Sequence, residues 1–251
     1  MFLAARRWGI NAALMAVVLS NVGCATGPNV NPKDPLEPMN RSVTKFNDVL
    51  DDNLLKPVAT GYRDYTPQFV QTGVGNFFRN ISDMFSTVNN GLQLKGRDTA
   101  ESLMRVVVNS TFGIYGIFDV ATPIGLQRHP EDFGQTLGYW GVPDGPYLVL
   151  PVLGPSTVRD ASTLPIEWSL DPVGQHDMAA ERNTALVARV VDKRASLLKT
   201  TGLLSEAAID KYSFTRDGYL QFRRNQVFDG NPPDDDQLED PSAVPDAPSA
   251  K

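Results

Sequence analysis

The sequence predicts a single, mainly α-helical domain. Two observations carry this prediction. Apolar residues recur at helical spacing through most of residues 34–228, and few stretches alternate apolar and polar residues as a half-buried strand does. These 195 residues are enough for one domain with a sizeable core. They contain no internal repeat of fixed period.

The first predicted helix begins at the sequence Asp34-Pro35-Leu36-Glu37. Asp34 is expected to cap this helix, Pro35 suits the first helical position, and Glu37 can complete a capping box. Apolar residues then follow in steps of three and four, which places them on one face. These residues are Leu36, Met39, Val43, Phe46 and Leu50.

Two helical pieces are predicted within residues 70–94, where the apolar residues include Phe77, Phe78, Met84, Phe85 and Val88. The next helix is expected to start at a second capping box, formed by Asp98 and Glu101 ahead of the apolar residues at 103–108.

A long amphipathic helix is predicted around residues 186–198, with Gly202 as its expected end, and a last helix over residues 214–225. Tyr147–Leu150 could form a short strand, but a proline stands at each side of it, which argues against a sheet. The following Gly154-Pro155-Ser156 is interpreted as a turn and helix cap.

The N-terminus has the pattern of a bacterial lipoprotein signal peptide over residues 1–23. Arg6 and Arg7 precede about 16 uncharged residues, and this run ends at Cys24, the only cysteine in the chain. A lone cysteine cannot form an internal disulfide. We therefore expect lipidation of Cys24, followed by an anchor linker over residues 24–33. An ordinary signal peptide with an incidental cysteine is the alternative.

The C-terminus, residues 229–251, holds seven acidic residues, one lysine and five prolines. A segment this polar cannot bury enough apolar surface to offset the entropy lost on ordering it. We therefore predict a disordered acidic tail. The whole chain has a formal charge of −6, and the tail accounts for most of it. The body between the two ends is close to neutral, which excludes the basic footprint of a nucleic-acid-binding protein.

Residues 113–154 differ in composition from the rest of the body. They contain eight glycines, five prolines and six aromatic residues, but only five charged ones. One interpretation is the glycine-rich core of a soluble domain; the other is a set of short helices and turns at membrane depth. Tyr139, Trp140 and Tyr147 suit a membrane interface, and the predicted anchor favours this second interpretation.

The chain lacks the common signatures of an enzyme. It has only two histidines, His129 and His176, and neither stands in a metal-ligand spacing. No nucleophile elbow and no phosphate-binding P-loop are present. The sequence therefore predicts a protein that is not an enzyme and that needs no metal or other cofactor.

A series of short motifs resembles the MlaA (VacJ) family of outer-membrane lipoproteins, and together they cover roughly residues 34–225. The motifs are Asp34-Pro35-Leu36-Glu37-Pro38-Met39-Asn40-Arg41, Phe46-Asn47, Lys56-Pro57-Val58-Ala59, Tyr62-Arg63, Asn76-Phe77, Asn80, Val88-Asn89, Asn109-Ser110-Thr111, Phe118-Asp119-Val120-Ala121, Phe133-Gly134-Gln135-Thr136-Leu137-Gly138, Trp140-Gly141-Val142, Gly145-Pro146-Tyr147, Leu150-Pro151, Gly154 and Arg159-Asp160.

This resemblance implies a ring of amphipathic helices embedded in the outer membrane around an amphipathic channel. It implies removal of misplaced phospholipid from the outer leaflet and transfer to a periplasmic carrier, which an inner-membrane ABC transporter serves. A trimeric porin is the expected outer-membrane partner. A scaffold or porin-associated assembly factor without transport activity is the alternative function.

We predict two groups of site residues for such a channel. The pore or gate would be formed by Tyr139, Trp140, Gly141, Gly145, Pro146, Tyr147, Arg159 and Asp160. Arg159 could attract a phosphate, although a local cap or surface pair is an equally good interpretation of Arg159 and Asp160. The lipid-facing rim would be formed by Phe77, Phe78, Met84 and Phe85, for which a role in the core is as good an interpretation.

Overall fold

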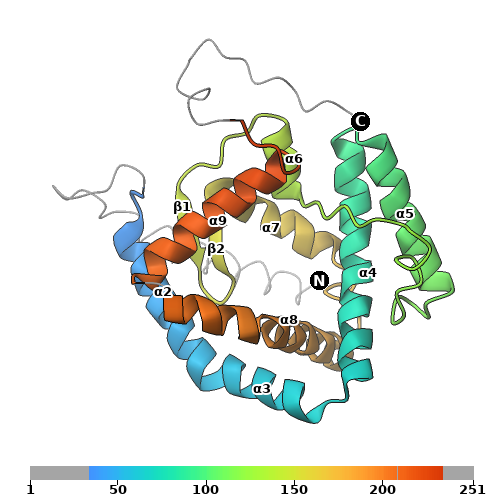
Figure 1. Cartoon of the computed structure of the whole chain (residues 1–251), viewed down its shortest axis with the longest axis horizontal. Helices are drawn as coiled ribbons and strands as arrows, with labels where there is room; N and C mark the ends of the chain where they lie inside the picture. Colours follow the sequence, from blue (N-terminus) through green and yellow to red (C-terminus); the bar gives the residue numbers. More distant parts are fainter. Residues whose placement is uncertain (1–33, 208, 234–251) are drawn as a thin grey trace, which may run out of the picture.

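The computed structural model describes residues 34–207 and 209–233, without the side chains of residues 203–207, and this part of the chain is mainly helical (Figure 1). The prediction of a mainly α-helical fold is thus confirmed. Cys24, the signal peptide, the linker and residues 234–251 of the acidic tail lie outside the described residues.

The first helical stretch is continuous from α2 (Glu37–Leu50) through a π-helical turn, η2 (Asp51–Leu55), into α3 (Lys56–Tyr65). Pro57 lies at the start of α3 and has no N–H to donate to the preceding turn. In the π turn the backbone N–H of Lys56 donates instead to the carbonyl of Asp51, five residues back. The proline is therefore accommodated by a local widening rather than a break.

Asp34 does not cap this helix, contrary to the prediction. The N-cap is Leu36, which makes no side-chain capping bond. The Asp34 carboxylate is instead fully buried and accepts hydrogen bonds from Tyr212 Oη at 2.5 Å and Arg216 Nη1 at 3.2 Å. The Asp34 carboxylate therefore bonds to Tyr212 and Arg216 of a distant helix, although its position in the sequence predicted a bond to the backbone at the helix start.

Helices α4 (Gln68–Leu92) and α5 (Gly96–Thr111) form an antiparallel hairpin along one side of the molecule (Figure 1). The prediction of two pieces within residues 70–94 was wrong, because α4 runs unbroken through its glycines. The capping box at α5 was also wrong: the helix begins at Gly96 with Lys95 as N-cap. Asp98 and Glu101 face His129 instead, with Glu101 Oε2 2.9 Å from His129 Nε2.

A two-stranded antiparallel hairpin, β1 (Tyr147–Leu150) and β2 (Gly154–Thr157), corrects the expectation that there is no sheet. The flanking prolines are tolerated because Pro146 precedes the first strand and Pro151 lies in the turn. The segment from Gly154 to Ser156 is a strand rather than a helix cap. The cap is its neighbour Thr157, whose Oγ1 accepts the N–H of Asp160 at 3.2 Å.

The remaining helices are α6 (Phe133–Tyr139), α7 (Val158–Leu170), α8 (Ala179–Ala207) and α9 (Lys211–Val227). The long amphipathic helix passes through Gly202 instead of ending there. The last helix matches its predicted range within a few residues.

In Figure 1 α2, α3, α4 and α5 lie along the outside of the molecule, and α7 lies toward its middle. Helix α8 packs against both α3 and α4, and α9 packs against α6 and β2. Elements that lie far apart in the sequence are thereby joined into one body. Among the described helices, none is both long and apolar enough to cross a membrane by itself.

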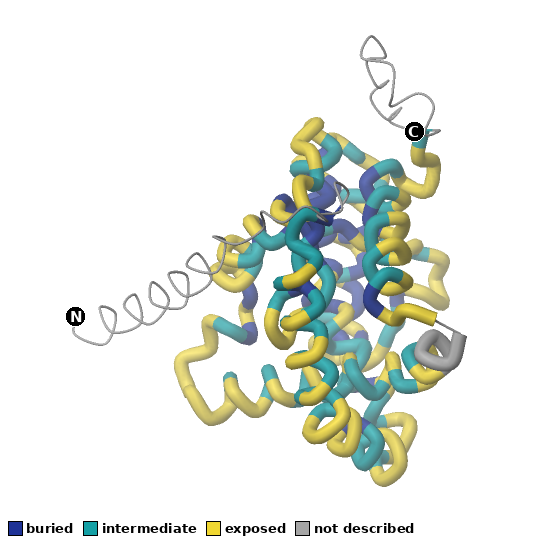
Figure 2. The backbone as a smooth tube through the Cα atoms, turned by 90° about the vertical axis from the view of Figure 1, so that its left-hand side faces the viewer, coloured by how far each residue is buried: buried dark blue, intermediate teal, exposed yellow. Residues whose placement is uncertain are grey.

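Burial is inverted relative to a soluble domain. Within the described residues, 21 polar or charged residues are buried, against nine hydrophobic ones. The largest fully buried side chains, Gln93, Asn40, Asn89 and Asn90 among them, are polar. Figure 2 shows these buried positions inside the helical body, with exposed residues along its outer turns. Large hydrophobic side chains are exposed in numbers that a water-soluble surface rarely carries.

Ion pairs and hydrogen bonds hold this polar interior together. Asp83 on α4 accepts bonds from Arg105 Nε at 3.1 Å and Arg128 Nη2 at 2.8 Å. Arg105 also reaches Asp119 at 3.2 Å. Buried charges are tolerated only when paired and hydrogen-bonded, so these contacts fix the loop at residues 119–128 against α4 and α5. The small apolar core lies elsewhere, around Tyr147, Val149 and Tyr212.

Candidate functional site

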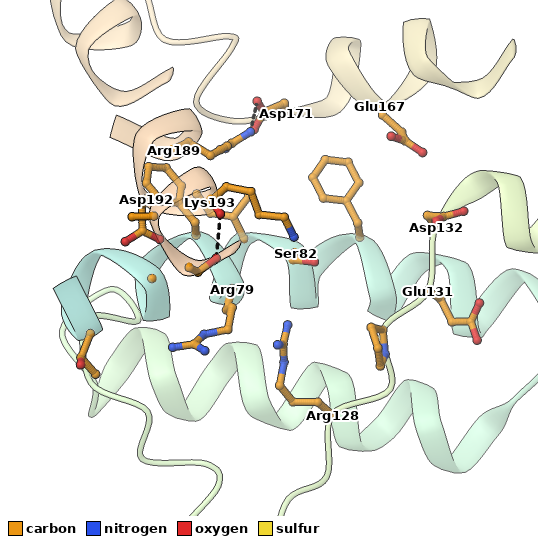
Figure 3. A pocket seen from close by; sticks show the side chains of 18 of the residues that line it. Arg79, Ser82, Arg128, Glu131, Asp132, Glu167, Asp171, Arg189, Asp192 and Lys193 are labelled. Atoms are coloured by element: carbon orange, nitrogen blue, oxygen red, sulfur yellow. Dashed lines mark hydrogen bonds and ion pairs between the residues drawn. The ribbon is translucent and has the colours of Figure 1, made fainter. Parts of the chain in front are cut away.

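A cavity of about 870 Å³ opens between α4, α7, α8 and the segment at residues 128–133 (Figure 3). Three of these elements are helices with a polar face toward the cavity. On α8, for example, Arg189, Asp192, Lys193 and Ser196 recur at steps of three and four, so they share one side of the helix. The polar part of the lining therefore comes mainly from stripes on α4 and α8.

Apolar side chains form part of the lining. Phe78, Ile81 and Phe85 come from α4, and Phe133 and Trp168 come from α6 and α7. The Arg189 guanidinium lies 5.0 Å from the centre of the Phe78 ring, a cation–π distance. Aromatic and charged groups thus meet in one cavity, which makes it amphipathic.

Two of the four cations that line the cavity are neutralised by ion pairs. Arg128 bonds to Asp83 at 2.8 Å, and Arg189 bonds to Asp171 through two contacts of 2.8 and 3.0 Å. Both carboxylates are nearly inaccessible to water. The Arg189 pair is bidentate, and Arg128 donates twice to one oxygen of Asp83, so both guanidinium groups are fixed in the cavity wall.

Glu167 and Asp192 are cavity carboxylates without an ion-pair partner among the described residues. Burial raises the pKa of Glu167, and the negative charge of Asp132 raises it further. Burial also raises the pKa of Asp192, although Tyr62 Oη donates a hydrogen bond to it at 3.1 Å. The same burial, with the charge of Asp192, raises the pKa of Tyr62 to about 12. Partial burial is thus the main cause that raises the pKa values of these cavity acids.

The outer surface beside the cavity is strongly apolar. The loop after α5 exposes Phe112 and Tyr115 by 76% and 78%, and Ile114, Phe118 and Ile124 are also exposed. Ile114 and Tyr115 both have left-handed backbone conformations, which is unusual for side chains of this size. The chain accepts this conformation while turning apolar side chains outward, and a patch of this kind marks a protein or membrane contact surface.

A second cavity of about 560 Å³ lies on the far side of the segment at residues 128–131, and Tyr139 contributes to its lining. Its histidine, His129, is enclosed by Asp98 and Glu101. In the described part of the chain, however, no cluster of three or more histidine, cysteine or acidic residues has the arrangement of a metal site.

Comparison with known proteins identifies the family. The MlaA lipoprotein family matches residues 32–226. The chain belongs to the MlaA lipoprotein family.

Its relatives in the MlaA family include a protein of Escherichia coli strain K12 named intermembrane phospholipid transport system lipoprotein MlaA. The two are 35% identical over 213 residues, which cover 80% of this chain and 81% of the relative. An uncharacterised protein of Rickettsia felis is 43% identical over 195 residues, covering 77% of this chain and 78% of that protein.

A solved structure described as the structural basis for maintenance of bacterial outer membrane lipid asymmetry shares the fold. It superposes with a TM-score of 0.64 at 34% sequence identity, over 77% of this chain and 98% of that chain. The MlaA resemblance read from the sequence motifs is therefore confirmed.

The residues predicted as an MlaA-type pore or gate do not line the larger cavity. Tyr139 and Trp140 end α6, where their rings stack edge to face at 5.5 Å. Trp140 Nε1 donates to the Leu92 carbonyl at 3.1 Å, and Lys95 lies 5.6 Å from the Tyr139 ring centre. These aromatic residues connect α6 to the end of α4.

The other members of the predicted gate lie in and beside the β hairpin. Gly141 and Gly145 both have positive φ angles, and an added Cβ at Gly145 would approach Val158 to 3.2 Å. Pro146 is exposed just before β1, while Tyr147 is 2% exposed in the apolar core.

Arg159 and Asp160 belong to a buried ion-pair network rather than to the cavity wall. Asp160 bonds to Arg223 on α9, and Arg223 also bonds to Asp132 at 2.7 Å. Arg159 pairs with Asp144 and Asp160. The network joins α6, α7 and α9, so the surface-pair interpretation does not describe these residues.

The predicted rim divides between two environments. Phe78 and Phe85 line the cavity, whereas Met84 is 44% exposed on the outside of α4. Phe77 is half-buried and packs edge to face on Phe78 at 5.3 Å. A helix of an amphipathic ring has an inner and an outer face, and these four residues are distributed over both faces of α4.

Sequence reasoning missed the polar lining on α4 and α8. Arg79, Ser82 and Asn89 on α4 recur at helical spacing, as Arg189, Asp192 and Lys193 do on α8. Such polar stripes can be read from the sequence. They were missed because a search for apolar stripes assumes that the polar face of each helix is exposed to solvent.

Proposed function

We propose that this protein removes misplaced phospholipid from the outer leaflet of the outer membrane and hands it to a periplasmic lipid carrier. One observation carries the proposal: an amphipathic cavity lies inside a helical body whose interior is polar and whose outer surface is apolar. An intermembrane phospholipid transport system is named for the relatives in Escherichia coli and Haemophilus influenzae, which supports the lipid substrate.

The physical obstacle to phospholipid movement between leaflets is the polar headgroup. Transfer of a charged or strongly polar group into hydrocarbon is costly, so the unassisted step is slow. A cavity with charged side chains can replace the headgroup's hydration while the acyl chains stay in an apolar environment. At about 870 Å³ the cavity lies near the upper end of the roughly 300–1,000 Å³ typical of small-molecule sites.

Membrane embedding of this protein is supported by its exposed apolar side chains. Those of α5 and the following loop, such as Leu103, Met104, Val107 and Phe112, would lie against acyl chains. We propose that Cys24, when lipidated, adds an anchor on the periplasmic side. More than one acyl chain gives stable attachment, and a lipidated N-terminal cysteine supplies several.

Two protein partners follow from this proposal. A trimeric porin would cover part of the outer apolar surface, and a soluble periplasmic carrier would accept the lipid and deliver it to an inner-membrane ABC transporter. The energy for transport would come from that ABC transporter, which acts on the carrier. The scaffold alternative needs only the porin contact.

Gly141 and Gly145 remain residues of our proposed gate. Gly141 and Gly145 have positive φ angles, which glycine adopts without strain. An added side chain would therefore stiffen or distort the link between α6 and the β hairpin. Outer-leaflet phospholipid should rise in cells that carry Gly141→Val or Gly145→Val. Wild-type lipid asymmetry in both variants would contradict a gating role.

The function is tested by deleting the gene and measuring phospholipid in the surface leaflet with a membrane-impermeant amine label. We expect more labelled phospholipid after deletion, and restoration by the full-length gene but not by Cys24→Ala. Phospholipid should also co-purify with the wild-type protein. Unchanged asymmetry together with altered porin levels would refute transport and favour the scaffold.

A further inference from the structure

The four cations that line the larger cavity differ in their charge balance. Arg128 and Arg189 are each held by a buried carboxylate, as described above. Arg79 and Lys193 also line the cavity, but neither has a carboxylate within ion-pair distance in the described part of the chain. Two positive charges are therefore available to a ligand that carries negative charge.

Arg79 makes no ion pair in the described part of the chain, although the nearby carboxylate of Asp192 balances part of its charge. Its Nη2 donates to Asn76 Oδ1 at 2.7 Å, one turn earlier on α4, which leaves most of its five N–H donors free for another acceptor. Gly75 keeps the space beside it open. A Cβ at Gly75 would lie 3.5 Å from both Arg79 Nη2 and Asp192 Oδ2, so these groups flank one small space between α4 and α8.

Lys193 approaches from the opposite wall. It belongs to α8, which packs against α4, and Figure 3 shows its side chain extending from α8 toward α4. Lys193 is exposed, and its ammonium group is a mobile point charge with three donors, which suits a phosphate. Its neighbour Asp192 accepts a hydrogen bond from Tyr62 on α3 through Oδ1, while its Oδ2 stays beside Gly75 and Arg79.

We infer that Arg79 and Lys193 form an anion subsite in the cavity, which takes the phosphodiester of a glycerophospholipid while Phe78 and Phe85 contact its apolar part. This inference rests on the proposed function and adds the residues that recognise the headgroup. Both cations line the same cavity, and a charge-assisted bond from a guanidinium or an ammonium to a phosphate oxygen is a strong one.

The subsite is tested on the purified full-length protein in a non-ionic detergent by calorimetric titration. Three probes separate the possible ligands: dihexanoylphosphatidylglycerol, dihexanoylglycerol without a phosphate, and inorganic phosphate. For Arg79→Gln and Lys193→Gln we expect about a tenfold loss of affinity for the phospholipid each. Affinity for dihexanoylglycerol should not change.

Matched controls lie outside the cavity. Lys199 is six residues after Lys193 on α8 and therefore faces another direction, and Arg63 on α3 is exposed. Lys199→Gln and Arg63→Gln should bind like the wild type. Asp192→Asn removes the one negative charge beside Arg79 and should tighten phospholipid binding several-fold, a gain that no unfolded variant could show.

Each result decides the inference. Unchanged phospholipid affinity in the Arg79→Gln/Lys193→Gln double variant would overturn it, as would inorganic phosphate that binds as tightly as the phospholipid. If the double variant also restores lipid asymmetry as well as the wild type does, only the subsite fails. If the wild type itself binds no phospholipid and does not affect asymmetry, the proposed function fails as well.

Discussion

Asp160 joins α7 to α9 at the centre of the buried ion-pair network, so its neutralisation tests whether that network holds the fold. Its two carboxylate oxygens accept bonds from Arg223 Nε and Nη2, both at 2.9 Å, from Arg159 Nε at 3.2 Å and from Tyr219 Oη at 2.9 Å. Asp160→Asn keeps the shape but replaces one acceptor with a donor that faces guanidinium groups.

The expected loss in the free energy of unfolding is about 3–5 kcal/mol, the range for removing one partner of a buried pair. Arg159 and Arg223 have side chains only 3% and 7% exposed, so water cannot replace the lost carboxylate charge. For a domain of this size each kcal/mol shifts Tm by roughly 2–4 °C, which predicts a fall of about 6–20 °C.

The assay is thermal unfolding in detergent, followed by tryptophan fluorescence and circular dichroism. Asp64→Asn is the control, because Asp64 forms an exposed pair with Arg63 and such pairs contribute little to stability. A Tm for Asp160→Asn equal to that of the control would refute the reasoning. It would show that the polar interior is hydrated rather than held by the network.

Three further predictions concern the same interior. Gly134→Ala should lower the free energy of unfolding by about 1–3 kcal/mol, because its Cβ would lie 2.4 Å from Asp160 Oδ1. Chemical unfolding measures this loss, and a variant as stable as the wild type would contradict the predicted clash. Gly116→Ala should destabilise the fold by a comparable amount, since Gly116 has a φ angle of +88° and a Cβ would lie 2.5 Å from that of Asn80. Proteolysis at the loop after α5 should become faster, and an unchanged cleavage rate would count against this prediction. Burial raises the pKa values of Asp132 and Asp160, but bonds from Arg223 outweigh it and lower both. The contribution of these two carboxylates to stability is therefore complete above about pH 5 and is lost as the pH falls below about 4 through their folded-state pKa values. The stability of Asp160→Asn should therefore depend less steeply on pH in acid unfolding.

The sequence by itself determined the helical class and much of the helix pattern. Local spacing is enough for this, because a helix satisfies its own backbone and shows its faces at intervals of 3.6 residues. The last helix was predicted over residues 214–225 and extends over Lys211–Val227. The string of short motifs also sufficed to identify the family, which the family match over residues 32–226 confirms.

Local rules failed where a distant partner competes for a side chain. Asp34 and Asp98 have the spacing of helix caps, but Asp34 pairs with Tyr212 and Arg216, and Asp98 faces His129. The strand Tyr147–Leu150 was discounted for its prolines, yet β2 pairs with it and α2 packs on it.

Only the tertiary structure decided which polar residues form the cavity. Arg79 and Lys193 are more than a hundred positions apart, and their shared cavity depends on how α8 packs against α4. The same packing decides that polar faces turn inward and apolar faces outward. The spacing of residues along a helix shows which residues share an apolar face and which share a polar face. The medium around the molecule and the neighbouring helices decide which of the two faces is buried.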